Sequence, residues 1–271
     1  MSQSAFITGA TSGIGYATAK VLASRGYRLG IAARNSEKLE AVKQELEMKF
    51  NSEVYTYVLD VRDAEAIKQV AAQAIQDMGV PDVLVNNAGL ARGLESYEET
   101  DEADIIQMVD TNIKGLFLVT HAFLPGMVKR NTGHIINLGS TAGLYAYKGA
   151  AVYCATKAAV KTFSDGIRID TIDTDIKVTT IQPGIVHTPF SEVRFHGDKK
   201  RADAVYEGVD ALHRKTSLMS LPLYWTGLCV CRFPILSLWL TSRPQGSWYP
   251  RHQKYLINNF PALLPMQETV N

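Results

Sequence analysis

The stretch from Ser4 to Arg25, SAFITGATSGIGYATAKVLASR, decides which fold the chain is expected to adopt. It begins with a short apolar run, Ser4 to Thr8, which has the length and composition of a buried strand. A glycine-rich turn follows up to Gly15, and apolar residues then recur at helical spacing from Tyr16 onward. A strand, a glycine turn and a helix in this order open an α/β sheet, and this is the context that a dinucleotide-binding turn requires.

Each glycine of the turn has its own physical task. Gly9 lets the chain turn sharply, Gly13 lets the backbone approach a pyrophosphate, and Gly15 lets the helix pack on the sheet. The N-terminus of the helix then faces the phosphates with its free N–H groups. The glycine spacing alone is weak evidence, and the flanking strand and helix strengthen it. The cofactor contacts expected in this turn are Gly9, Thr11, Ser12, Gly13, Ile14 and Gly15.

The composition indicates one globular domain. With 271 residues, of which 46% are hydrophobic, the chain can bury one sizeable core. A net charge of +1 gives no reason to expect nucleic acid or an anionic membrane as a partner. The three cysteines, Cys154, Cys229 and Cys231, lack metal-ligand spacing, so no metal site is expected. With no signal peptide evident, this cysteine usage indicates a reducing, cytoplasmic location.

Strand-like and helix-like patterns alternate after Arg25. Two charged amphipathic helices are expected at Ser36–Lys49, opened by a Ser36 cap, and at Asp63–Met78. A long helix from Glu102 to Arg130 is interrupted near Gly115. We therefore predict a single doubly wound Rossmann domain, with a mostly parallel sheet of about seven strands flanked by helices. The further strands expected are Tyr27–Ala33, Val54–Leu59, Pro81–Val85, His134–Leu138 and Lys177–Ile181.

The end of the second strand bears on the choice of cofactor. Arg34 follows this strand, and no carboxylate occurs before Glu37. A carboxylate here would hold the ribose 2′-hydroxyl of NAD, whereas an arginine accommodates the 2′-phosphate of NADP. The position therefore predicts NADP, and the alternative is that Arg34 is only a solvated loop charge. At the end of the third strand, Asp60 and Val61 are expected beside the adenine.

A second stretch, Gly139 to Lys157 (GSTAGLYAYKGAAVYCATK), carries the predicted chemistry. Tyr153 and Lys157 are four residues apart, so on a helix they share one face. A neighbouring ammonium favours a phenolate, and we therefore expect Lys157 to lower the pKa of Tyr153. Ser140 follows a strand and is expected to hydrogen-bond the same substrate oxygen. The alternative is an exposed helical pair without function.

Three further segments are expected at the same site. The turn after the fourth strand contributes Asn87, Ala88 and Gly89, which as a plain turn would be unremarkable. Asn112 lies at the helix interruption, where it can support a water relay toward Lys157 or be purely structural. The residues from Pro189 to Arg201 form a loop long enough to act as a substrate lid. The turn after the sixth strand is expected beside the nicotinamide and the phosphates, through Pro183, Gly184, Ile185, Val186 and Thr188.

Taken together in order and spacing, the motifs TGATSGIG, NNAG, Asn112, Ser140, YCATK and the Pro183–Gly184 turn resemble those of the short-chain dehydrogenase/reductase family. The likeness covers about residues 3 to 212. It implies that Tyr153 is the acid/base and that Ser140 orients the substrate oxygen. It further implies that Lys157 contacts the ribose and tunes Tyr153, and that Asn112 supports the relay.

A narrower resemblance is to the NADP-dependent 3-hydroxy acid dehydrogenases, which act on serine, allo-threonine and related acids. The stretches that carry it are NNAGLARGLE, DTNIKG, LPGMVKRNTGHIINLGSTAG and FSEVRFHGD. The substrate class comes from this resemblance alone. An acid substrate needs a cation for its carboxylate, and the candidates are Arg194 in the lid, Lys148 and Arg92.

Beyond Leu212 the resemblance breaks, and residues 213–271 are a divergent segment of the same domain. One hypothesis is a disturbed reading frame: codons for Arg214 to Pro222 can be chosen so that reading two nucleotides later encodes an acidic amphipathic helix. A second shift would explain the family-like LWLTSRPQGSWY at Leu238 to Tyr249. A second hypothesis is a membrane anchor at Ser217 to Leu240, which Arg232 within that stretch disfavours. The third is a divergent, poorly packed segment.

These observations predict an NADP-dependent oxidoreductase that exchanges a hydride with a small hydroxy or carbonyl compound, by preference a 3-hydroxy acid. One alternative is a carbonyl reductase for steroid, retinoid or lipid-like substrates, possible with a membrane-associated tail. Another is a catalytically impaired NADP-binding protein. The resemblance further implies a homo-oligomer, a dimer or tetramer, formed through the long helices Glu102–Arg130 and Ala150–Ile172.

Overall fold

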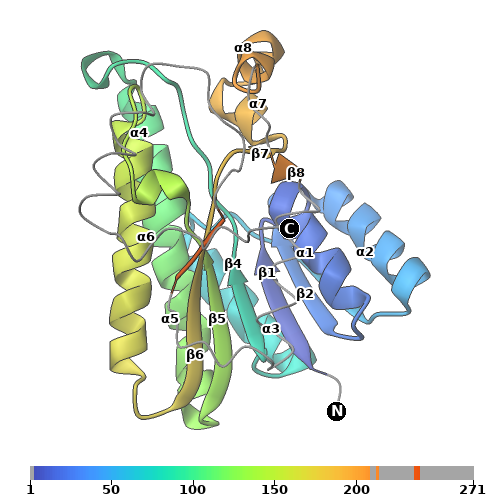
Figure 1. Cartoon of the computed structure of the whole chain (residues 1–271). Coiled ribbons are helices and arrows are strands. Elements are labelled where there is room, and N and C mark those ends of the chain that lie inside the picture. Colours follow the sequence, from blue (N-terminus) through green and yellow to red (C-terminus); the bar gives the residue numbers. More distant parts are fainter. Residues whose placement is uncertain (1–2, 208–211, 214–234, 239–271) are drawn as a thin grey trace, which may run out of the picture.

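The computed structural model of the chain describes residues 3–207, 212–213 and 235–238. A sheet of seven strands crosses the molecule in the order β3-β2-β1-β4-β5-β6-β9, and every neighbouring pair is parallel (Figure 1). The predicted doubly wound sheet is therefore confirmed. The strands are β1 (Ser4–Thr8), β2 (Arg28–Ala33), β3 (Val54–Val58), β4 (Val83–Asn86), β5 (Thr132–Leu138), β6 (Asp175–Pro183) and β9 (Ile235–Leu238).

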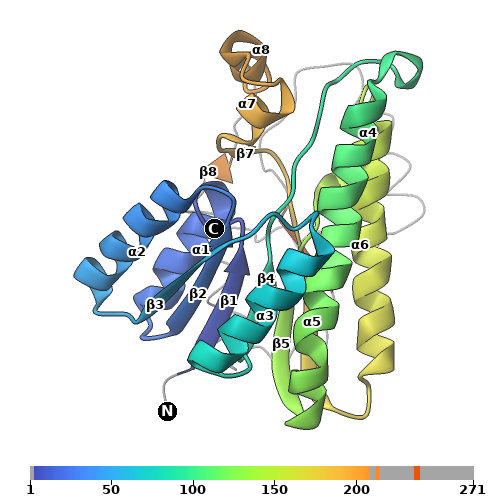
Figure 2. The ribbon, with the colours of Figure 1, turned by 180° about the vertical axis from the view of Figure 1, so that it is seen from behind.

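Helices cover both faces of the sheet. One face carries α1 (Gly13–Ala23) and α2 (Ser36–Phe50), and the other carries α3 (Ala64–Met78), α5 (Leu116–Lys129) and α6 (Ala151–Asp170); α3 and α5 are seen in front in Figure 2. Because successive side chains of a strand point to opposite faces of the sheet, a single strand contributes to the core on both faces. Phe6 packs on Phe123 of α5 with ring centroids 4.7 Å apart, while Ile7 joins the opposite core cluster with residues of α1 and α2.

Polar caps fix where several helices begin. The Asn35 side chain accepts a hydrogen bond from the Lys38 backbone N–H at 2.7 Å and so caps α2, where we expected Ser36 to be the cap. The Asp63 side chain caps α3 in the same way by accepting bonds from two backbone N–H groups. Asp101 caps α4 (Glu102–Val109). Asn35 starts the helix one residue earlier because its amide oxygen reaches the third N–H beyond it.

The predicted interruption of the long helix is confirmed. Between α4 and α5 the chain forms a π-helix, Asp110–Gly115, whose wider turn contains Asn112. Close packing explains the glycine at its end, since a Cβ atom on Gly115 would lie 2.6 Å from the carbonyl oxygen of Val61. The wide turn therefore lies against the carboxyl end of β3.

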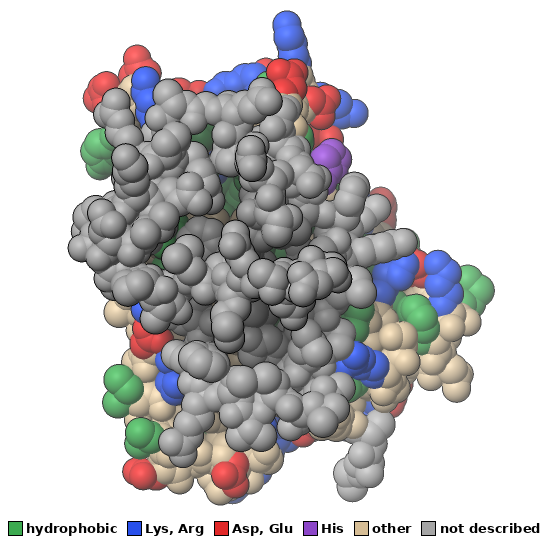
Figure 3. All heavy atoms as spheres, in the orientation of Figure 1, with side chains coloured by type: hydrophobic (Ala, Val, Ile, Leu, Met, Phe, Trp, Pro, Cys, Tyr) green, Lys and Arg blue, Asp and Glu red, His purple; other side chains and the backbone are tan. Residues whose placement is uncertain are grey.

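The segment predicted to act as a substrate lid differs from the loop that we expected. Residues 189–201 contain the short helix α7 (Phe190–Arg194) and the start of α8 (Lys199–Ala204), above the carboxyl ends of the strands in Figure 1. The Asp198 side chain caps α8 by accepting a hydrogen bond from the Arg201 N–H. Below the lid, β7 (Val186–His187) pairs with β8 (Leu212–His213). Figure 3 shows positive and negative side chains intermixed along this upper part of the molecule.

Part of the divergent tail enters the sheet. Strand β9 pairs with β6 in the register Thr180↔Ile235, so four residues of the apolar stretch 217–240 form the seventh strand. The segments invoked for a shifted reading frame, 214–222 and most of 238–249, lie outside the described residues, as does the rest of the apolar stretch. Within the described ranges no helix has both the length and the apolarity needed to cross a membrane.

Candidate active site

The site lies where β1, β4, β5 and β6 end, on either side of the point at which the strand order reverses. The glycine turn occupies the end of β1, with Gly9 and Gly13 at positive φ of 67° and 54°. The Asn87 side chain donates hydrogen bonds to the carbonyl oxygens of Thr8 at 2.9 Å and Gly9 at 3.0 Å. A Cβ atom on Gly15 would lie 2.3 Å from the same amide nitrogen. Glycine is therefore required where Asn87 fastens β4 to the turn.

The start of α1 is open to an anion. Its N-cap residue, Ser12, is exposed and makes no capping hydrogen bond with its own side chain, so the first N–H groups of α1 stay available. Thr188 lies beside them, because a Cβ atom on Gly13 would be 3.4 Å from its methyl group. The turn after β6 and the glycine turn are thus neighbours, as the sequence predicted for Thr188.

At the outer end of the site, Arg34 is exposed directly after β2. Asp60, at the end of β3, is held by Arg62, whose Nε and terminal nitrogen donate to the carboxylate at 3.0 and 2.6 Å. Arg62, with a smaller effect of Arg34, lowers the pKa of Asp60. Sequence reasoning missed Arg62, although its position two residues after Asp60 was a signal. Asp60, the carboxylate expected beside the adenine, is therefore paired with the Arg62 cation.

The predicted catalytic side chains converge. Tyr153 and Lys157 lie one turn apart on α6 and are 8% and 6% exposed, so the alternative of an exposed helical pair is excluded. The Nζ atom of Lys157 lies 6.0 Å from the ring centroid of Tyr153 and donates to the Leu138 carbonyl oxygen at 2.8 Å. Ser140, at the end of β5, accepts a hydrogen bond from the Ala142 N–H and is hydrogen-bonded to Tyr153.

Burial dominates the titration of this pair. It raises the pKa of Tyr153 to about 12, against the smaller opposing effects of the Ser140 hydrogen bond and the Arg194 charge. Burial also lowers the pKa of Lys157 to about 8. The expected direction of the Tyr153 pKa shift is therefore corrected: desolvation of the phenolate outweighs the Ser140 hydrogen bond and the Arg194 charge.

A polar row beneath the site holds α6 on the sheet. Asn86 of β4 and Asn137 of β5 are neighbours in register, and the Asn86 amide donates to Asn137 Oδ1 at 2.9 Å. Asn137 in turn donates to Ser164 of α6 at 2.9 Å, and Asn86 also donates to Thr120 of α5. Sequence reasoning missed this row because its hydrogen bonds join four segments that are distant along the chain.

Asn112 is buried in the π-helix and acts as a clamp. Its amide exchanges hydrogen bonds with both the N–H and the carbonyl group of Leu90, at 2.8 and 2.7 Å, and donates to Thr156. A Cβ atom on Gly89 would lie 3.2 Å from Asn112 Oδ1 and 3.4 Å from Lys157 Nζ. Asn112, the NNAG turn and Lys157 are therefore together, while the water relay stays a prediction.

Of the three cations expected to bind an acid substrate, one lies against Tyr153. Arg194 is 6% exposed, and its guanidinium carbon is 5.3 Å from the Tyr153 ring centroid. Arg92 is instead engaged by Gln107 at 2.7 Å and by Asp104. Lys148 is exposed at the rim of a cavity. The geometry favours Arg194.

Sequence reasoning missed the partner of Arg194, which is Tyr147. The Arg194 guanidinium donates to the Tyr147 hydroxyl at 2.8 Å and also lies over the Phe190 ring. Its Nε atom is buried, and within the described part of the chain it has no hydrogen-bond partner. The only signal in the sequence was a second tyrosine six residues before Tyr153.

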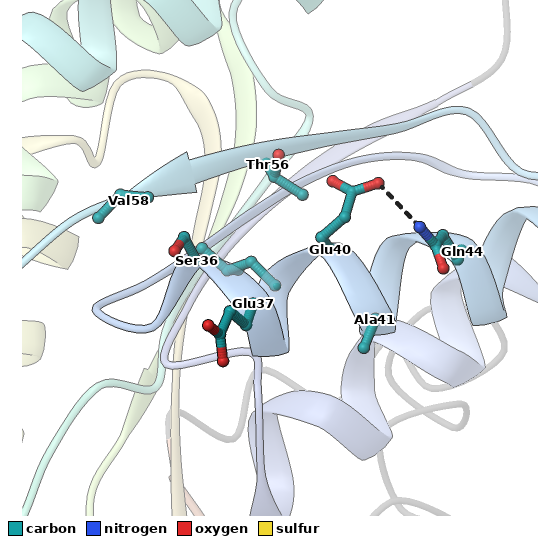
Figure 4. A pocket seen from close by; sticks show the side chains of 8 residues that line it. Ser36, Glu37, Glu40, Ala41, Gln44, Thr56 and Val58 are labelled. Carbon is teal, nitrogen blue, oxygen red and sulfur yellow. Dashed lines mark hydrogen bonds between the residues drawn. The ribbon is translucent and has the colours of Figure 1, made fainter.

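A cavity of about 190 Å³ lies beside Tyr153. Its walls come from the segments 92–100 and 147–153 and from Met108 of α4. A wider hollow of about 550 Å³ lies between α2 and the edge strand β3, where Figure 4 shows Glu40 beside Gln44. That hollow is remote from Tyr153, because β3 is the outermost strand on the opposite side of the sheet.

Comparison with known proteins identifies the family. The profile described as short chain dehydrogenase matches residues 3–199. The chain belongs to this family. Among proteins related to this short chain dehydrogenase, the NADP-dependent 3-hydroxy acid dehydrogenase YdfG of Salmonella typhi is 47% identical over 207 residues, which cover 76% of the chain and 82% of the relative.

One further relative and one solved structure are similar over most of their length. The sulfoacetaldehyde reductase of Chromohalobacter salexigens is 43% identical over 213 residues, covering 78% of this short chain dehydrogenase and 83% of the relative. Among solved structures, the closed form of a serine dehydrogenase complexed with NADP+ superposes with a TM-score of 0.81 at 38% identity, covering 90% of this chain and 98% of that one.

Proposed function

We propose that this short chain dehydrogenase transfers a hydride between NADP(H) and a small 3-hydroxy acid or the corresponding 3-oxo acid. The observation that carries the proposal is the buried pair of Tyr153 and Lys157, with the partly buried Ser140 hydrogen-bonded to Tyr153 and the Arg194 guanidinium beside it. The names of the relatives support it, since they include an NADP-dependent 3-hydroxy acid dehydrogenase and a serine dehydrogenase complexed with NADP+.

The glycine turn fits a dinucleotide, because the first N–H groups of α1 carry no side-chain cap from Ser12 and can bind a phosphate. We assign the pyrophosphate to the turn Gly9–Gly15 and to Thr188, and the 2′-phosphate to Arg34. Asp60 and Val61 would flank the adenine. When bound, the nicotinamide accepts or supplies the hydride. The remaining contacts assigned to the cofactor are Asn87, Ala88, Gly89, Tyr153, Lys157, Pro183, Gly184, Ile185 and Val186.

The protein's own part in the reaction is to hold and move one proton. In oxidation, Tyr153 as phenolate accepts the proton of the substrate hydroxyl while Ser140 holds the same oxygen by a hydrogen bond. In reduction, Tyr153 as phenol donates the proton to the carbonyl oxygen. Lys157 supplies positive charge behind the phenol, and Asn112 fixes the backbone at Leu90 on its other side.

The buried charge of Arg194 and the names of the relatives favour a small acid over a steroid or retinoid substrate. The cavity of about 190 Å³ beside Tyr153 is lined by Arg92 and Lys148 among others, and Arg194 is not among its lining residues. A small acid places its charged group near Arg194, whose buried Nε lacks a partner among the described residues. The name of the sulfoacetaldehyde reductase relative is consistent with an acid group that is either a carboxylate or a sulfonate.

We further propose that the protein is cytoplasmic and self-associates. Residues 1–212 would form the catalytic domain, with the lid at 189–201, and residues 213–271 would complete the same domain. Ile106 and Val109 of α4 and Ile169 of α6 are 52%, 39% and 68% exposed, which leaves apolar surface on helices expected at an interface. Light scattering of the purified chain tests this point: a monomer at micromolar concentration would contradict it.

The test of the proposed function is initial-rate NADP+ reduction with L-serine, L-allo-threonine, 3-hydroxyisobutyrate and a steroid alcohol, repeated with NAD+. We expect activity on the hydroxy acids with NADP+ and none on the steroid. Activity on the steroid alone would favour the carbonyl reductase. No activity while NADPH still binds would favour a catalytically impaired binding protein.

A further inference from the structure

Arg194 stands out because its charge is buried without a carboxylate partner among the described residues. Its guanidinium is held by the hydroxyl of Tyr147 and lies over the rings of Tyr147, Tyr153 and Phe190, at 5.9, 5.3 and 5.8 Å. The other lid arginine, Arg201, is half-exposed and paired with Glu95 at 2.8 Å. An arginine stays protonated in proteins, so Arg194 brings a permanent positive charge to the site.

This charge faces two anions. The first is the Tyr153 phenolate, because a cation at about 4–6 Å in a buried site favours the charged form of a neighbouring acid. The second is an anionic ligand, for which the unpartnered Nε atom is a ready donor. One guanidinium cannot stabilise both fully, since a ligand anion that neutralises it removes its attraction for the phenolate.

We propose that Arg194 couples the binding of an acid group to the protonation state of Tyr153, so that an acidic substrate favours protonated Tyr153 and thereby the reduction of 3-oxo acids. This inference rests on the proposed function and deepens it. Without an acid group, the Arg194 charge favours the phenolate. With an acid group bound, this attraction is cancelled, and the protonated phenol, which is the form that donates to a carbonyl oxygen, is favoured further.

The other groups around Tyr153 do not replace this effect. Lys157, on the same helix, is held by the Leu138 carbonyl oxygen and is assigned to the ribose. Ser140 at the end of β5 lowers the pKa of the phenol through a hydrogen bond, whereas Tyr147 in the preceding loop and the adjacent Cys154 raise it, and none of the three brings a positive charge. Arg194, on α7, is therefore the charged neighbour within reach of a substrate's acid group.

The test compares an acid substrate with its neutral isostere. The pH profile of kcat/KM reports groups of the free enzyme, and the profile of kcat reports the same groups in the substrate complex. For the oxidation of 3-hydroxybutyrate, we expect the midpoint of the kcat profile to lie at higher pH than that of kcat/KM. For 3-hydroxybutyramide, which lacks the charge, the two midpoints should coincide.

Variants separate coupling from a structural role. In Arg194→Gln the difference between the profiles should vanish for 3-hydroxybutyrate, and kcat/KM for this acid should fall by roughly 10- to 100-fold, more than for the amide. Arg194→Lys, which keeps the charge, should restore part of the difference. Lys200→Gln, an exposed lid residue, should behave as the wild type. A difference that persists in Arg194→Gln would overturn the proposal.

A binding measurement keeps the inference testable should 3-hydroxy acids prove not to be substrates. Calorimetry in buffers of different ionisation enthalpy measures the protons taken up when propionate binds the NADP+ complex at alkaline pH. We expect uptake with propionate, none with propionamide, and none with propionate in Tyr153→Phe or Arg194→Gln. Binding of propionate without uptake, or no binding at all, would refute the coupling whichever substrate the enzyme uses.

Discussion

The Nζ atom of Lys157 donates a hydrogen bond to the carbonyl oxygen of Leu138 across 2.8 Å. This bond ties α6 to the end of β5, next to the strand-to-turn junction that carries Ser140. Because Tyr153 lies one helical turn before Lys157, the same bond sets the height of the phenol above the sheet. The ammonium is thus both a charge at the site and a structural link between the two elements that carry the catalytic side chains.

Replacement of Lys157 by methionine tests the cost of burying this ammonium. The pKa of Lys157 is lowered from 10.5 to about 8 by burial. Between these values the unfolded chain binds the proton that the folded protein has released, so the free energy of unfolding rises with pH across this window. We expect the wild type to gain stability relative to Lys157→Met from about pH 8 to pH 10.5.

Urea unfolding at pH values below, within and above this window measures the difference. Lys161→Met is the matched control. Lys161 lies on the same helix, and its ammonium forms a partly exposed salt bridge with Asp165. That variant should keep the alkaline gain of the wild type. A difference between wild type and Lys157→Met that is flat across the window would show that Lys157 is not destabilised by burial.

Replacement of Tyr153 by phenylalanine tests its role as the acid/base. The change removes only the hydroxyl from a buried ring, so the packing against Phe190 stays in place. General acid/base catalysis contributes about 10²- to 10⁴-fold, and kcat should fall by that amount while NADPH binding is retained. Tyr55→Phe, on the edge strand β3 and remote from Tyr153, is the control. An unchanged rate in Tyr153→Phe would assign the chemistry to another group.

Much of this fold could be predicted from local sequence because the signals were local. The strand, glycine turn and helix from Ser4 to Arg25 predicted a doubly wound parallel sheet. The four-residue spacing of Tyr153 and Lys157 predicted that both lie on one face of a helix, which is α6. The break at Gly115 followed from residues that weaken a helix. Each of these features depends on neighbours within a few positions along the chain.

What could not be predicted depends on contacts between distant segments. The short helices of the lid form where α7 and α8 lie against the segment after β4, as in the hydrogen bond from the Gly93 N–H to the Arg194 carbonyl oxygen. The pairing of Arg194 with Tyr147 spans 47 residues. The raised pKa of Tyr153 likewise follows from burial, which spacing along one helix does not show.

Replacement of Gly15 by alanine tests the cradle around the glycine turn. A Cβ atom would meet the Asn87 amide at 2.3 Å and the Gly9 carbonyl oxygen at 2.4 Å, so the turn or β4 must shift. We expect a loss of about 1–3 kcal/mol of stability and a marked weakening of NADPH binding, measured by thermal unfolding and fluorescence titration. Gly166→Ala, in α6 with no described residue within 4 Å of the added atom, should be about 1 kcal/mol more stable than the wild type. Equal NADPH affinity in Gly15→Ala would show that the packing of the glycine turn against Asn87 does not control cofactor binding.

Replacement of Arg34 by aspartate tests the choice between the two nicotinamide cofactors. Arg34 is exposed just beyond β2, and the nearby Asp60 carboxylate is already bound by Arg62. Removing the guanidinium loses a charge-assisted bond to the 2′-phosphate, worth about 1.5–3 kcal/mol, and the new carboxylate repels that phosphate while accepting a ribose hydroxyl. The ratio of kcat/KM for NADP+ to that for NAD+ should therefore fall by at least about 10- to 100-fold. Arg25→Asp, which places the same charge change at the end of α1, should leave the ratio unaltered. If Arg34→Asp also leaves it unaltered, then Arg34 is the solvated loop charge of the alternative interpretation, and the 2′-phosphate must be bound elsewhere.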